Sequence, residues 1–182
     1  MNKNNTSDCT ADMIRTRRMR LSIRAEYRRL AWKAVGFWAV VYLVFTQAFL
    51  VTRNAGLGMF PALKDGDLLI AYRLEWDYAR NDVVVYSANG RQETGRVIAG
   101  EGDVVEMDQN GTLRVNGTVQ SGEILYPTYA KEKEDFSYQV PEKQVFILGD
   151  FRTNTADSRD YGSIPVSDIR GKVITILRRR GL

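Results

Sequence analysis

The chain contains no histidine and only one cysteine, Cys9, among its 182 residues. Without histidine, the Ser-His-Asp and Cys-His mechanisms of hydrolysis and histidine-ligated metal sites are excluded. Any hydrolysis must therefore use lysine or a carboxylate as its base. A single cysteine also excludes an intramolecular disulfide. We expect neither a metal site nor a cofactor.

Positive charge is concentrated at the N-terminus, where residues 1–33 hold nine Lys or Arg and three acids. The next segment, Ala34–Thr52, has nineteen residues without a formal charge. This length just suffices to cross a bilayer core of about 30 Å. Trp38 and Tyr42 lie in its first half, where interfacial aromatic side chains are expected. The pattern predicts a transmembrane helix; a buried core helix or a cleavable signal peptide is the alternative.

The charge asymmetry also predicts an orientation. Cytoplasmic flanks of membrane spans carry an excess of Lys and Arg. We therefore expect a cytoplasmic basic arm at 1–33, a transmembrane helix at 34–52 and an extracytoplasmic β domain at 53–182, with a single pass through the cell membrane. Bases next to a span contact anionic lipid, so we expect the lipid membrane as a partner and no nucleic acid.

The predicted external part is rich in short runs of β-branched residues separated by turn signals. Asn110-Gly111, for example, stands between two such runs and is a strong hairpin signal. The pattern predicts a mainly β fold of coiled antiparallel sheets. The segment Ser121–Val140 is polar, and we expect it to be a solvated insertion. The predicted strands are Asp67–Tyr72, Asp82–Ser87, Glu93–Ala99, Asp103–Met107, Thr112–Val115, Val145–Leu148 and Lys172–Leu177.

Three segments resemble the conserved boxes of the type I signal peptidase family, in the same order. Gly58-Met59-Phe60-Pro61-Ala62-Leu63, followed by Gly66-Asp67, is similar to Ser-Met-x-Pro-Thr-Leu…Gly-Asp. Gly95-Arg96-Val97-Ile98-Ala99-Gly100-Glu101-Gly102-Asp103 is similar to Lys-Arg-Val-Ile-Gly-x-x-Gly-Asp. The segment from Gly149 to Arg159, with Tyr161-Gly162 after it, is similar to Gly-Asp-Asn-Arg-x-x-Ser-x-Asp-Ser-Arg. The resemblance runs from about residue 30 to the C-terminus and implies antiparallel sheets of the signal peptidase I type.

The resemblance also implies how the family hydrolyses peptides: a serine attacks and a neutral lysine takes its proton. Gly58 stands at the serine position and Gly95 at the lysine position, and glycine supplies neither group. We therefore expect no catalytic residue and no enzymatic activity. Thr155 stands where the family has the serine that supports the lysine.

Two further sets of residues follow from the resemblance. The candidates for a peptide-binding groove are Met59, Phe60, Pro61, Leu63, Arg96 and Val97; for the apolar ones, ordinary core packing is an equal alternative. The third box is expected to form a buried turn and ion-pair network rather than a directly functional site. Its members are Gly149, Asp150, Arg152, Thr155, Asp157, Ser158 and Arg159.

With both dyad positions occupied by glycine, the chain resembles the inactive signal-peptidase-like pilus assembly proteins of streptococci. That resemblance implies an accessory or chaperone factor in pilin polymerisation at the Gram-positive surface, with pilin subunits and a pilin-specific sortase as partners. One alternative is an active membrane-bound signal peptidase with a displaced nucleophile, either Ser87, Ser158 or Ser163, served by Lys64 or Lys172. Another is an engineered knockout of an active enzyme.

Overall fold

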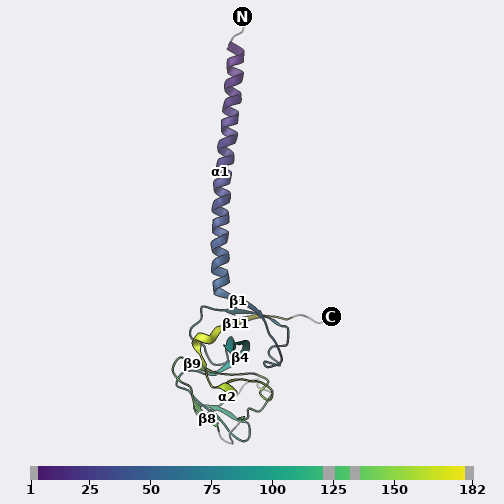
Figure 1. Cartoon of the computed structure of the whole chain (residues 1–182), viewed down its shortest axis with the longest axis vertical. Coiled ribbons are helices and arrows are strands. Elements are labelled where there is room, and N and C mark those ends of the chain that lie inside the picture. The colour runs from purple at the N-terminus through teal and green to yellow at the C-terminus, as the bar shows by residue number, and fades with distance from the viewer. Residues whose placement is uncertain (1–3, 121–125, 132–135, 179–182) are drawn as a thin grey trace. The chain divides into compact units, whose positions relative to one another are not determined.

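The structure, a computed structural model, describes residues 4–120, 126–131 and 136–178, with side chains from residue 26 onward. Helix α1 (Asn4–Ala48) runs through the basic arm and the apolar segment (Figure 1). Its part from Glu26 to Ala48 is long and apolar enough to cross a membrane. The helix ends earlier than predicted, because residues 49–52 belong to a strand. The chain divides into two compact units, residues 1–46 and 47–182.

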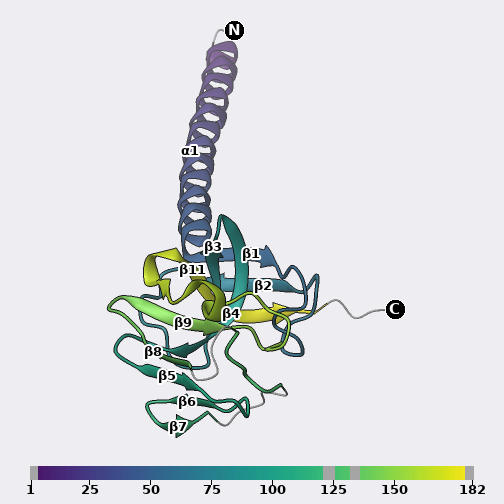
Figure 2. The ribbon, with the colours of Figure 1, turned by 60° about the horizontal axis from the view of Figure 1, so that its bottom comes forward.

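The second unit is built from two antiparallel sheets (Figure 2). The larger sheet has the order β1-β2-β11-β3-β4-β9-β10 and the smaller one β7-β6-β5-β8. A short helix, α2 (Ser158–Tyr161), and a 3₁₀ turn, η1 (Val166–Asp168), lie between strands near the C-terminus. The strands are β1 (Phe49–Arg53), β2 (Leu68–Tyr72), β3 (Val83–Ala88), β4 (Arg91–Ala99), β5 (Val104–Met107), β6 (Leu113–Val115), β7 (Thr118–Val119), β8 (Phe136–Gln139), β9 (Gln144–Leu148), β10 (Ile164–Pro165) and β11 (Ile169–Leu177).

The mainly β, antiparallel fold confirms the sequence prediction. All seven predicted strands are present, with ends that differ by a few residues. The β5–β6 hairpin turns at Asn110-Gly111, as the sequence indicates. Gly111 has a φ of +78°, a conformation that a side chain rarely tolerates. Asp108 accepts hydrogen bonds from the backbone N–H groups of Asn110 and Thr112 and closes this turn.

Strands β4 and β9 lie at the centre of the packing, because both of their faces are buried. Val97 and Ile147 pack in one apolar cluster with Val84 of β3. Ile98 and Phe146 point the other way, into a second cluster that includes residues of β5 and β6. This two-sided burial explains why residues 97–99 at the end of β4 and residues 145–148 of β9 are continuous apolar runs. The loop after β9, which carries the third box, therefore starts from the centre of the packed core.

The segment predicted as a solvated insertion contributes to the core instead. Residues 121–125 and 132–135 of it lie outside the described residues. Strand β8 pairs with β5, and Tyr138 of β8 packs on the buried cluster of Phe146. Thr128 is buried and accepts a hydrogen bond from the guanidinium of Arg152. The polar composition hides these contacts, since every second residue of a half-buried strand is polar.

Candidate functional site

The first and third boxes meet through a close approach of their backbones. Gly58 lies in the turn after β1, and its carbonyl accepts a hydrogen bond of 3.0 Å from the N–H of Phe151. A Cβ atom on Gly149 would lie 2.6 Å from this same carbonyl oxygen, so the approach requires glycine at 149. A Cβ atom on Gly58 would lie 3.1 Å from Cγ2 of Thr155. The methyl group of Thr155 thus lies against Gly58, while its hydroxyl donates to the carbonyl of Phe151 and the carboxylate of Asp157.

Gly95 lies in the middle of β4, between β3 and β9, and is buried. A Cβ atom there would overlap Cγ2 of Ile147 and lie 3.2 Å from Cε1 of Tyr86. The phenol of Tyr86 is buried and shares a hydrogen bond of 3.3 Å with that of Tyr161. Burial raises the pKa of Tyr86, and the bond to Tyr161 raises it further. The space beside Gly95 is therefore filled by apolar atoms and a neutral phenol.

The predicted groove residues separate into a buried and a more accessible group. Met59, Leu63 and Val97 are fully buried in the core, so they cannot form an apolar wall that faces a bilayer or a client. Phe60 and Arg96 are partly exposed and Pro61 is exposed. For the buried three, core packing is the correct interpretation. A peptide-binding role for the others stays a prediction.

The third box is organised around the buried carboxylate of Asp157. Its Oδ1 and Oδ2 accept hydrogen bonds of 2.9 Å and 2.8 Å from Nε and Nη2 of Arg159, and both side chains are almost fully buried. Asp157 also accepts from the hydroxyl of Thr155 at 3.0 Å and caps the N-terminus of α2. The hydroxyl of Ser158 accepts a hydrogen bond from the N–H of Ile147 and ties α2 to β9. This is the arrangement expected of a turn and ion-pair network.

A second ion pair joins the second box to the third. Arg96 of β4 donates two hydrogen bonds, of 2.8 Å and 2.6 Å, to the carboxylate of Asp150. Arg152, two residues after Asp150 in the chain, is fully buried. Burial lowers the pKa of its guanidinium to about 10, although Asp150 and Asp157 counteract the shift. In the described part of the chain, Nε and Nη2 of Arg152 have no hydrogen-bond partner, which is costly for a buried cation.

The serines and lysines considered as a displaced dyad are not brought together. Ser158 is buried and Ser163 is bonded to Tyr138 and Gln144. Lys172 forms an ion pair of 2.8 Å with Asp82, which raises the pKa of its ammonium group, the opposite of what a general base needs. Lys64 and Ser87 line two separate cavities, at Asp65 and Asp67 for Lys64 and at Arg73 and Arg91 for Ser87.

Sequence reasoning overlooked two residues at this site, Tyr86 and Lys131. Tyr86 fills the space at Gly95, and Lys131 donates hydrogen bonds to the backbone carbonyl of Thr155 and to the carboxylate of Asp160. Lys131 begins a run of charged residues that is typical of a solvent-exposed surface. No local pattern reveals either contact. Lys131 and Thr155 are 24 positions apart, and Tyr86 and Gly95 lie on the paired strands β3 and β4.

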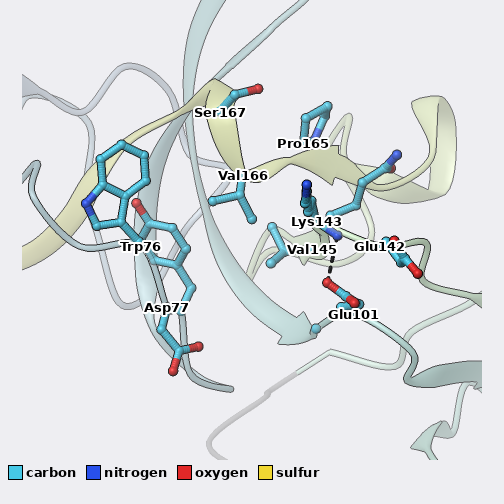
Figure 3. Close-up of a pocket in the computed structure, with 12 residues that line it drawn as sticks. Trp76, Asp77, Glu101, Glu142, Lys143, Val145, Pro165, Val166 and Ser167 are labelled. Carbon is cyan, nitrogen blue, oxygen red and sulfur yellow. Dashed lines mark hydrogen bonds between the residues drawn. The ribbon is translucent and has the colours of Figure 1, made fainter.

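A separate cavity of about 580 Å³ lies beside the start of β9 (Figure 3). Val145, Val166 and Pro165 form its apolar side, and the exposed indole of Trp76 stands across from them. Glu101 closes one edge by accepting a hydrogen bond of 2.8 Å from the N–H of Lys143. Neither glycine of the predicted dyad lines this cavity, so it is distinct from the site at Gly58.

The model of the signal peptidase, peptidase S26 family matches residues 26–177. The chain belongs to this family. It is 32% identical to signal peptidase I of Bacillus caldolyticus over 164 residues, which cover 80% of the chain and 87% of that enzyme. It is 32% identical over 158 residues to signal peptidase IB of Staphylococcus aureus, covering 74% and 82%.

Other relatives match over a smaller share of their own length. Thylakoidal processing peptidase 1 of Arabidopsis thaliana is 29% identical over 171 residues, and the chain spans 48% of it. The solved structure of a signal peptidase I from Enterococcus faecalis V583 is 28% identical, with a TM-score of 0.46. It covers 54% of this chain and 97% of that one.

These relatives correct one expectation and confirm another. The resemblance to type I signal peptidases is confirmed. The expectation that the chain is not an enzyme is wrong on this comparison, since the family is a peptidase family and its relatives at 31–32% identity are named signal peptidases. The assignment of Gly58 and Gly95 to the serine and lysine positions stays a prediction, as does the likeness to pilus assembly proteins.

Proposed function

We propose that the chain is a membrane-anchored peptidase of the signal peptidase type, which cleaves extended segments of polypeptides as they leave the membrane. The observation that carries the proposal is the match to signal peptidase I of Bacillus caldolyticus along 87% of that enzyme. The apolar helix from Glu26 to Ala48, continued directly by the β domain, supports action at a membrane surface. Orientation with a cytoplasmic N-terminus belongs to the same proposal.

The nucleophile has to be a hydroxyl from a residue other than Gly58, because glycine has no side chain. Thr155 is the candidate beside Gly58: its methyl carbon Cγ2 faces Gly58, and its Oγ1 lies 3.0 Å from Oδ2 of Asp157. In this scheme Oγ1 attacks the scissile carbonyl, and its proton passes to the carboxylate of Asp157 and from there to the leaving amine as the peptide bond breaks. A water molecule then hydrolyses the ester on Thr155, which releases the new carboxylate and restores the hydroxyl. A carboxylate is a far weaker base than the neutral lysine of the signal peptidase mechanism, so we expect slow turnover.

The test is cleavage of a precursor carrying a signal peptide by the purified full chain in neutral detergent. The host signal peptidase must be absent, which mass spectrometry of the preparation verifies. We expect slow cleavage that Thr155→Ala abolishes and Thr155→Ser retains. Thr153→Ala, at an exposed position two residues away, is the matched control and should leave the rate unchanged.

Two outcomes contradict the proposal in different ways. If the unaltered chain binds the precursor without cleaving it, the peptidase activity is refuted. If cleavage survives Thr155→Ala while the melting temperature is unchanged, the chain is a peptidase but Thr155 is not its nucleophile.

A pilus role would concern the substrates of this activity. Pilin subunits and a pilin-specific sortase are predicted partners from resemblance alone. Deleting the gene tests this role. If the chain is a peptidase that acts on pilins, the deletion strain should accumulate pilins that still carry their signal peptides. Normal pili and normally processed pilins in the deletion strain would refute the pilus role.

A further inference from the structure

Three arginines line one cavity of about 330 Å³ in the β domain. Arg73 follows β2, Arg91 begins β4 and Arg170 lies in β11, and all three side chains are exposed. Ser87 and Gln92 add polar groups, and Leu50 adds an apolar edge. Among the residues that the structure describes, no acidic side chain lines the cavity, and none of the three arginines has an ion-pair partner.

The topology of the larger sheet places these arginines at one end of four neighbouring strands. Strand β2 ends there, because Tyr72 pairs with Lys172 near the start of β11. Strand β3 also ends there and β4 begins there, since Ala88 pairs with Arg91 across the hairpin. The register between β11 and β3 shifts at Arg170, and such irregularities re-aim a side chain.

The same end of the sheet is where the chain leaves the apolar helix. Phe49, the first residue of β1, pairs with Tyr72, the last residue of β2. The N–H of Arg73 donates a hydrogen bond of 2.8 Å to the carbonyl of Ala48. Ala48 is the last residue of the segment that is long and apolar enough to cross a membrane. Arg73 is therefore bonded to the residue at which that segment ends.

The opposite end of the sheet gives a contrast. A cavity of about 570 Å³ there is lined by Arg53 and Lys64, but also by Asp65 and Asp67. Arg178 contributes to it as well and forms an ion pair of 3.3 Å with Asp67. Positive charge is thus balanced by acids at the end where β1 finishes and left unbalanced at the end where β1 begins.

We propose that Arg73, Arg91 and Arg170 bind the phosphate of an anionic phospholipid headgroup at the membrane surface. A planar guanidinium group can donate two parallel hydrogen bonds to two phosphate oxygens. Three guanidinium groups around one cavity can therefore bind one phosphodiester. Leu50 gives the cavity an apolar edge that an acyl chain can contact. The site fixes the β domain against the bilayer. The lipid site rests on the membrane anchoring in the proposed function but not on peptidase activity. A negative cleavage assay therefore does not refute the lipid site.

The experiment counts lipids bound to the full chain by native mass spectrometry from neutral detergent. Phosphatidylglycerol is the probe, and phosphatidylcholine with the same acyl chains is the uncharged reference. The triple variant Arg73→Gln, Arg91→Gln, Arg170→Gln should bind phosphatidylglycerol about tenfold more weakly or worse, given the typical strength of Arg–anionic lipid attraction. The control variant Arg53→Gln, Lys64→Gln, Arg80→Gln removes the same charge elsewhere and should bind like the unaltered chain.

The control is needed because the basic N-terminal arm also attracts anionic lipid and is present in every variant. Equal weakening in both triple variants, or none in either, would refute the site. Displacement of the lipid by inorganic phosphate at equal concentration would show a free-phosphate site and refute the lipid assignment. If the triple variant melts at a lower temperature, Arg91→Gln alone, at the exposed first residue of β4, should still weaken binding about fivefold.

Discussion

Gly95 of β4 packs directly against Ile147 of β9, and a Cβ atom on this glycine would overlap the methyl group of Ile147. We predict that Gly95→Ala lowers the free energy of unfolding of the β domain by about 1–3 kcal/mol, the usual cost of overpacking a core. Gly100→Ala is the control, because a Cβ atom there meets nothing within 4 Å. Thermal melting of the full chain in detergent measures both. Equal stability of the two variants would mean that β4 and β9 adjust without cost.

The buried carboxylate of Asp157 should be the most sensitive single position in the third box. Asp157→Asn removes the charge that pairs with Arg159 and leaves that buried guanidinium uncompensated. We expect a loss of about 3–5 kcal/mol, seen as a fall in melting temperature of about ten degrees or more. Asp168→Asn, at an exposed position, should change little. A small effect at Asp157 would show that the network does not hold the fold.

Stability should fall in acid partly through Asp103. Burial acts to raise the pKa of Asp103, but hydrogen bonds from the N–H of Gly100 and the side chains of Asn116 and Arg80 outweigh it and lower the pKa. The ionised form therefore stabilises the fold above the unfolded-state pKa of about 3.9, and this contribution is lost as the pH falls through the lower folded-state value. Asp103→Asn should lower the melting temperature at pH 7 and converge with the unaltered chain near pH 2. A constant difference between the two at all pH values would contradict this assignment.

The predicted orientation can be tested with intact cells from which the wall has been removed. Protease added outside should digest residues 53–182 and leave a short fragment that contains the basic arm. Antibody tags at the two termini identify which side is protected. Permeabilised cells provide the control, since both tags should then be lost. Protection of the C-terminal tag in intact cells would reverse the orientation.

Several features of this protein follow from the sequence alone. The apolar run after a basic arm specifies a helix that is long and apolar enough to cross a membrane. Alternating or continuous β-branched residues specify the seven predicted strands, and Asn110-Gly111 specifies a hairpin, because these signals are local. The three boxes identify the family, since their order and spacing survive in the chain. Each of these depends on residues that are close together in the sequence.

Other features depend on contacts that no local pattern encodes. That Tyr86 and Ile147 fill the space at Gly95 follows from the pairing of β4 with β3 and β9. The burial of Met59 and Leu63, the strand β8 inside a polar segment, and the end of α1 at Ala48 are decided in the same way. The gathering of Arg73, Arg91 and Arg170 is a consequence of strand order, because residues far apart in the chain meet only when the sheet sets which strand ends lie side by side.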